Sequence, residues 1–172
     1  NRVFQLPLAI FAIATSIALF PMIAKAIKNK DENRALHLMK KSSLILFAVL
    51  STSMLIGIVF NEFIVKLLFE RGAFNSVDTQ NTALILTMYL MGLLPFGLAK
   101  IFSLWLYANE QQYLSAKISM KSLAWNIVFS LILIKPYGAA GLAFASTLSG
   151  FILFFLTIKA FGFNKFITMY KK

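Results

Sequence analysis

The sequence has 172 residues, of which 59% are hydrophobic and 18 are phenylalanine, and its mean hydropathy of +0.78 excludes a water-soluble domain of this size. It contains no cysteine, so disulfides and thiolate chemistry are excluded. The net charge of +11 does not indicate nucleic-acid binding, because the basic residues lie between apolar segments, where the positive-inside rule for membrane proteins accounts for them.

The first apolar segment, from Val3 to Ala26, predicts a membrane-spanning helix. Its 24 residues can cross a hydrocarbon core about 30 Å thick at a helical rise of about 1.5 Å per residue. Pro7 and Pro21 predict kinks near its two ends. The basic segment that follows, residues 25–41, predicts a cytoplasmic connector, and its His37 has no partner at a spacing that would share a metal ion.

A second span is predicted over residues 42–60, and a polar island at 69–79 separates it from the next apolar run. Gly72 permits a tight chain reversal in the island because it lacks a Cβ atom. Asn75 or Ser76 can cap the helix that follows. The island therefore predicts a turn and a helix start at the outer surface.

The third span is predicted over residues 77–108, which as one helix would be about 48 Å long and exceed the hydrocarbon core. Gly92, Pro95 and Gly97 predict a bend near its middle. No polar turn separates the halves, so we expect one bent helix with its bend near Pro95.

Two further spans are predicted over residues 118–134 and 139–158, joined by a short outer turn. Asn126 lies inside the first of them and must face other helices, because an amide in hydrocarbon needs a hydrogen-bonding partner. The predicted fold is thus an all-α integral membrane protein with five transmembrane helices in a single membrane domain, residues 1–172. We expect this domain to be a piece of a longer polytopic chain.

Lysine and arginine are distributed unequally between the two predicted sides. The segments 25–41 and 109–121 and the tail from Lys159 hold twelve of these residues, and the opposite side holds three. The positive-inside rule therefore predicts that the first helix runs from outside to inside.

Enzymatic groups are scarce, since all six acidic residues lie in predicted connectors and there is one histidine. The sequence predicts a transporter or a membrane scaffold, with no enzymatic activity, cofactor or metal. Arg2 is either an interfacial anchor or a ligand for an anionic head group, because guanidinium groups bind phosphate bidentately. Lys100 either extends towards lipid headgroups or binds substrate, and the residues alone leave both choices open.

Several segments resemble one family in order and spacing. Leu68 to Thr79 is similar to the outer loop of the MurJ (MviN) lipid II flippases, which belong to the multidrug/oligosaccharidyl-lipid/polysaccharide exporter superfamily. The start of the chain, with Arg2 and Pro7, resembles a helix whose arginine lines the central cavity in that family. The other matching positions are Ala99-Lys100 with Tyr107, Asn126, and Pro136 followed by Gly141-Leu142.

The resemblance implies that this chain forms most of the second lobe of a two-lobe flippase in the bacterial inner membrane. Lipid II, an undecaprenyl pyrophosphate-linked disaccharide peptide, would then be moved from the inner to the outer leaflet. It also implies partners, namely lipid II, membrane lipids and an N-terminal lobe outside this chain. Arg2, Gln5, Lys100 and Asn126 are the substrate-binding residues that it implies.

The sequence departs from the family at a few positions: Asn1 stands where many members have aspartate, Leu104 and Ser115 replace prolines, and Asn109 and Gln111 replace charged connector residues. Two other functions stay open. A drug or metabolite antiporter of the same superfamily would need an acidic coupling residue inside a helix. A non-transporting membrane scaffold would tolerate loss of the charge at Arg2.

We predict opposite sides of the membrane for Asn33 and Ser76, because the twelve-to-three charge asymmetry places residues 25–41 inside. Single cysteines at these two positions, in the full-length protein without other cysteines, can be probed with a membrane-impermeant thiol reagent. Ser76→Cys should be labelled from outside and Asn33→Cys only after permeabilisation. The reverse pattern would show that the orientation is wrong.

Overall fold

Helices are the regular elements of the chain, and no strand occurs in the part of it described here. The computed structural model describes the backbone of residues 2–71 and 74–171 and the side chains of 5–71 and 74–171. The elements in chain order are α1 (Arg2–Pro7), the π-helix η1 (Leu8–Ile13), α2 (Ala14–Lys28), α3 (Glu32–Val59), α4 (Asn61–Phe69), α5 (Ser76–Leu90), α6 (Leu93–Ala108), α7 (Gln112–Phe161) and α8 (Phe163–Lys171).

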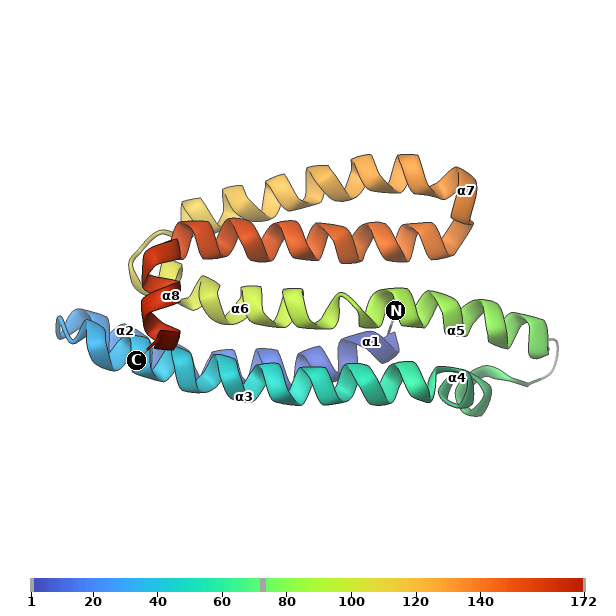
Figure 1. Cartoon of the computed structure of the whole chain (residues 1–172), viewed down its shortest axis with the longest axis horizontal. Helices are drawn as coiled ribbons and strands as arrows, with labels where there is room; N and C mark the ends of the chain where they lie inside the picture. The colour runs from blue at the N-terminus through green and yellow to red at the C-terminus, as the bar shows by residue number, and fades with distance from the viewer. Residues whose placement is uncertain (1, 72–73, 172) are drawn as a thin grey trace.

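Four helical stretches are long and apolar enough to cross a membrane: Gln5–Lys28, Glu32–Val59, Ser76–Ala108 and Gln112–Phe161. The last has 50 residues and turns back at Gly138, whose φ of 53° and ψ of −131° lie outside the helical region. It therefore supplies two spans, a first arm (residues 112–137) and a second arm (139–161), which lie side by side in Figure 1. The five predicted spans of an all-α membrane protein are confirmed.

The first span contains a π-helical segment directly after Pro7. Proline has no N–H group and its ring clashes with the carbonyl four residues before it, so an α-helix is disturbed there. That carbonyl belongs to residue 3, whereas the π turn lies after Pro7, where the backbone N–H of Ala14 bonds to the carbonyl of Ala9, five residues back. Pro21, in contrast, lies within α2 without a break, so the second predicted kink does not appear as an interruption of that helix.

The second helix begins at Glu32, and the expected start at residue 42 is wrong. Asp31 caps it, accepting a hydrogen bond of 3.0 Å from the backbone N–H of Arg34. Ala35 and Met39 are buried one turn apart, so the polar connector already has a packed face and the helix continues through it. The non-helical part of the connector therefore consists of residues 29–31.

Asn75 caps α5, as the polar island predicts. Its side-chain oxygen accepts bonds from the backbone N–H groups of Val77 and Asp78, while Asp78 accepts one from the N–H of Asn75. Thr79 adds a side-chain bond of 2.9 Å to Glu70 across the island. Gly72, the expected reversal point, lies outside the described residues.

The third span bends at Met91–Gly92, between α5 and α6, and the expected position near Pro95 is therefore off by one helical turn. Pro95 explains the difference, because the carbonyl that loses its donor belongs to Met91, four residues earlier. At the bend, the N–H of Gly92 bonds to Tyr89, three residues back. Helix α6 continues in the direction of α5 in Figure 1, as expected for one bent helix.

The fourth and fifth spans are longer than expected. The first arm of α7 begins at residue 112 and not at 118, and the second ends at 161 and not at 158. The expected outer turn at 135–138 is helical except at Gly138, the one residue with a positive φ there. Ser122 donates a 2.7 Å hydrogen bond to the carbonyl of Ser149, which ties the two arms together in the middle.

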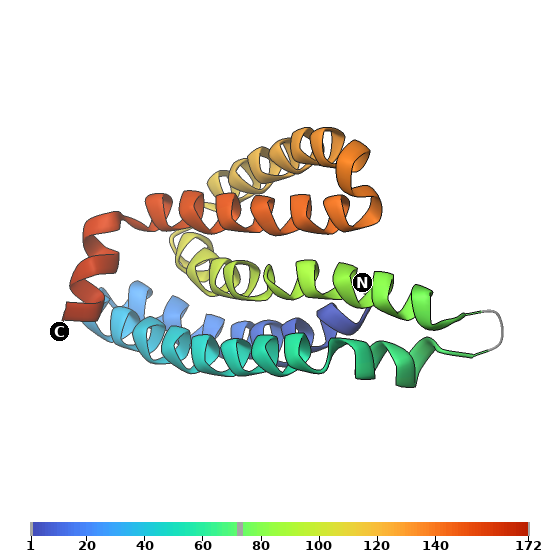
Figure 2. The same ribbon diagram turned by 45° about the vertical axis from the view of Figure 1, so that its right-hand side comes forward.

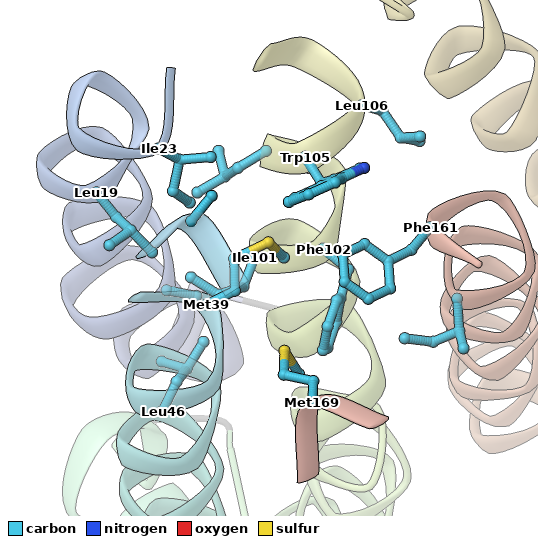
Figure 3. Packing of buried hydrophobic residues seen from close by; sticks show 14 of the residues in the cluster. Leu19, Ile23, Met39, Leu46, Ile101, Phe102, Trp105, Leu106, Phe161 and Met169 are labelled. Atoms are coloured by element: carbon cyan, nitrogen blue, oxygen red, sulfur yellow. The ribbon is translucent and has the colours of Figure 1, made fainter. Parts of the chain in front are cut away.

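The helices form layers around α6, which contacts α2, α3 and both arms of α7. The core lies at the end of the bundle that holds α8, where α2, α3, α6, α7 and α8 converge on one cluster of buried side chains (Figure 3). Phe102 lies at the centre of this cluster. Its ring is edge-on to the rings of Phe161 and Phe166, with distances between ring centres of 5.3 Å and 5.4 Å. Aromatic packing therefore joins the last two helices to the middle of the bundle.

Helix α8 crosses that end of the bundle instead of running along it (Figure 2). It follows Gly162, whose φ of 106° favours glycine. Lys165 pairs with Glu32 of α3 at 2.6 Å and lies 4.9 Å from the centre of the Trp105 ring. The hydroxyl groups of Tyr170 and Ser43 share a hydrogen bond of 2.6 Å. Burial raises the pKa of the Tyr170 hydroxyl above its ordinary value, and the smaller effect of the bond to Ser43 lowers it.

We predict that Gly141→Ala destabilises the hairpin of α7. A Cβ atom at Gly141 would overlap the backbone carbonyl oxygen of Leu133 on the first arm, which cannot move without distorting that helix. Such overpacking costs about 1–3 kcal/mol, seen as a lower midpoint of thermal unfolding of the full-length protein in detergent. Ala139→Ser, at an exposed neighbouring position, is the control, and equal midpoints for both variants would contradict the prediction.

Candidate functional site

A pocket of about 240 Å³ lies between the first span, α6 and α7. Helix α6 contributes a row of side chains, with Lys100, Ser103 and Tyr107 on one helical face. The π-helix η1 and the two arms of α7 supply the opposing walls. The full lining consists of Leu8, Ala12, Ile13, Phe96, Ala99, Lys100, Ser103, Tyr107, Ser119 and Leu153.

Hydroxyl groups form a short chain along this pocket. Ser115 donates a hydrogen bond of 3.2 Å to the hydroxyl of Tyr107, and Ser119 donates one of 3.1 Å to the carbonyl of Ser115. Ser103 donates to the carbonyl of Ala99 at 2.8 Å. Ser103 and Ser119 thus bond to carbonyls of their own helices, whereas Ser115 bonds from α7 to α6.

Lys100 is exposed, and its ammonium takes part in neither of the two ion pairs found among the described residues. No carboxylate lines the pocket. Asp31 and Glu110 lie in connectors, while Glu62 and Asp78 lie in the first turns of α4 and α5, outside the pocket. A positive charge without a local counterion favours an anionic ligand, because a cation inside a membrane domain is costly when unpaired.

The structure does not bring the four expected site residues together in one pocket. Gln5 is exposed on α1, one turn before Leu8, and does not line the pocket of Lys100. The backbone of Arg2 belongs to the same helix, but its side chain lies outside the described residues. For both residues, substrate binding stays a prediction.

Asn126 lies within the hairpin of α7 and not in the pocket. Its amide donates hydrogen bonds of 3.3 Å to Ser146 and 3.2 Å to Ser149 on the second arm. The expectation that this amide faces a neighbouring helix is therefore met. These contacts give Asn126 a role in packing, and its role in substrate binding stays a prediction.

Sequence reasoning missed Ser103 and Ser119 as pocket residues. Ser103 could have been found, because it follows Lys100 by three residues on the same helical face and precedes Tyr107 by four. Ser119 could not, since only the packing of α7 against α6 brings it to Lys100. The described residues contain no group of three or more His, Cys, Asp or Glu side chains that could hold a metal ion.

The sequence model of the family described as "Lipid II flippase MurJ" matches residues 1–171. This chain belongs to the MurJ family. The chain is thus part of a multi-pass membrane protein.

Relatives support the assignment. The chain is 52% identical over 171 residues to "Probable lipid II flippase MurJ" of Helicobacter pylori strain J99, covering 99% of this chain and 37% of that protein. It is 32% identical to the protein of that name from Thermotoga maritima, covering 92% and 33%. The solved structure "Lipid II flippase MurJ, inward closed conformation" matches with a TM-score of 0.79 at 24% identity, covering 98% of this chain and 38% of that chain. The chain therefore spans less than two fifths of these MurJ proteins, and the structural match shows a shared fold.

We predict that Asn126→Ala lowers the stability of the full-length protein by about 0.6 kcal/mol, and at most about 1.7, the range measured for hydrogen bonds between membrane helices. The reason is the loss of its bonds to Ser146 and Ser149. Unfolding of Asn126→Ala, Ser149→Ala and the double variant in detergent forms a cycle that isolates the contact. The changes in unfolding free energy caused by Asn126→Ala and Ser149→Ala should be non-additive. Those caused by Asn126→Ala and Ser103→Ala should be additive. Additivity in both cycles would contradict the packing role.

Proposed function

We propose that the protein containing this chain is a lipid II flippase of the bacterial inner membrane. The observation that carries the proposal is Lys100, a cation outside the ion pairs of the described residues, in a mainly apolar pocket that also contains the hydroxyl groups of Ser103, Tyr107 and Ser119 and no carboxylate, in a chain of the MurJ family. A pyrophosphate linked to a sugar matches this lining, because the ammonium binds phosphate oxygens and the hydroxyls bind sugar hydroxyl groups.

The proposed mechanism uses two lobes that alternately open a central cavity to each side of the membrane. This chain supplies most of the second lobe, and an N-terminal lobe outside it supplies the other wall. Arg2 and Lys100 bind the pyrophosphate while the prenyl tail remains in lipid. The bends after Pro7 and at Met91–Gly92 lie on two helices that line this region, so they are the positions where the helices can flex.

Two other functions fit less well. A drug or metabolite antiporter that couples transport to ions would need an acidic residue within a span, and the six acidic residues lie in connectors or terminal helical turns. A scaffold without transport would not need a cation such as Lys100 in a polar pocket. Both alternatives predict that neutralising Arg2 or Lys100 leaves growth unchanged.

The test is complementation of a bacterial strain depleted of its own flippase by the full-length protein. We expect Arg2→Ala to fail, since a bidentate charge-assisted contact is worth about 1.5–3 kcal/mol, roughly a tenfold to hundredfold loss in affinity. Lys100→Gln should impair growth for the same reason. Lys135→Gln, which removes an exposed lysine at the outer end of the α7 hairpin, is the matched control and should support normal growth.

Arg2→Lys distinguishes a planar bidentate contact from a simple charge effect. It should restore growth partly, because lysine keeps the charge and loses the fork of donors. Membrane levels of each variant separate misfolding from lost binding. Failure of the well-inserted unmodified protein to restore growth would refute the proposed function. Full growth with well-inserted Arg2→Ala and Lys100→Gln would refute the binding roles of these two residues and make Arg2 an interfacial anchor.

A further inference from the structure

A groove of about 430 Å³ lies at the end of the bundle that holds α8, far along α3 from the pocket of Lys100. It runs between the first turns of α3 and the last turns of α8, the two helices that meet there in Figure 2. Its lining consists of Asn33, Leu36, His37 and Lys40 of α3 and Thr168 and Met169 of α8. The pocket of the proposed transport function shares none of these residues.

The lining combines donors with an apolar surface. Asn33, His37 and Lys40 follow each other by four and three residues, so they share one face of α3. Leu36 and the buried side chain of Met169 provide the apolar part. A ligand with an anionic end and an apolar end matches this combination.

The positive charge of the groove is not neutralised by the protein. Neither Lys40 nor His37 takes part in an ion pair in the described ranges. The two acidic residues at the start of α3 are engaged elsewhere: Asp31 caps the helix and Glu32 pairs with Lys165. No carboxylate lines the groove, so nothing in it competes with an anion.

The position of α8 places the groove at a membrane surface. Met169 is buried against the bundle, while Phe163 and Ile167, one turn apart, are 63% and 40% exposed. An amphipathic helix with an exposed apolar edge and flanking lysines lies in the interface between headgroups and acyl chains. The groove beside it therefore opens at the depth of the lipid phosphates.

We propose that this groove binds an anionic phospholipid of the adjacent leaflet. Lys40, His37 and Asn33 donate hydrogen bonds to the phosphate, and the first carbons of the acyl chains lie over Leu36 and Met169. The lipid bridges α3 and α8, and so stabilises the docked position of α8. The protein binds it at a defined site and not by diffuse attraction to a charged surface.

The experiment uses the full-length protein in nanodiscs that contain phosphatidylglycerol with a photoreactive diazirine near the top of one acyl chain. Crosslinked peptides are quantified by mass spectrometry, and label is expected on residues 33–40 and 163–171. Lys40→Gln should reduce this label at least about tenfold, the loss of one charge-assisted contact to a phosphate. Lys40→Arg should retain it, which separates lost charge from lost folding.

Lys41→Gln is the matched control, because it removes the same charge from an exposed neighbour that does not line the groove. Its label should fall by no more than about fivefold, the effect of one lysine near an anionic membrane surface, and clearly less than that of Lys40→Gln. Equal loss for Lys40→Gln and Lys41→Gln would overturn the proposal in favour of diffuse attraction. Equal labelling by a phosphatidylcholine probe would overturn the requirement for an anionic lipid. Displacement of the label by soluble glycerol phosphate would overturn the lipid as the ligand.

Discussion

The structure depends on one constraint, which is that backbone and side-chain polar groups in a hydrocarbon environment must find partners inside the protein. Helices satisfy their own backbones, so the chain is helical almost throughout its described length. Where Pro95 removes a donor, the chain adapts locally by a bend one turn earlier, at Met91–Gly92. The same rule explains the serine and asparagine contacts between the two arms of α7.

Charged side chains also need partners or water in a membrane protein, and the carboxylates of this chain differ from Lys100 in how they meet this need. The carboxylates lie in connectors and helical ends, where water or a helix N-terminus can stabilise them. Lys100 is different, because it lines a pocket inside the bundle with hydroxyl groups and without a counterion. A transporter of anionic lipid-linked substrates has a use for such a cation, whereas a packed scaffold does not. This contrast connects the fold of this MurJ chain to the function that we propose for the whole protein.

The end of the bundle that holds α8 is built differently from the opposite end. Lys165, Tyr170 and the rings around Phe102 hold α8 against α3, α6 and the second arm of α7. The opposite end has the capping box of Asn75 and the close turn at Gly138. One end thus contains a dense aromatic core and a surface helix, and the other contains short turns. A lobe that moves as one body, as we propose, would be stabilised by such an end and by a lipid in the groove beside α8.

The sequence by itself predicted the five spans, a cap at Asn75 or Ser76 and a bend in the third span, because hydropathy, proline and capping residues act over a few neighbouring positions. It indicated the family through the order and spacing of several short segments. It did not determine where α3 and α7 begin, since Ala35 and Met39 show a helical face that only packing makes decisive. The site divides in the same way. Lys100 was recognisable as a cation in an apolar run, whereas Ser119 joined its pocket only through contacts between helices distant in the chain. Tertiary structure also assigned the amide of Asn126 to Ser146 and Ser149, because the hydrogen-bonding partner of a buried group depends on which helix lies opposite it.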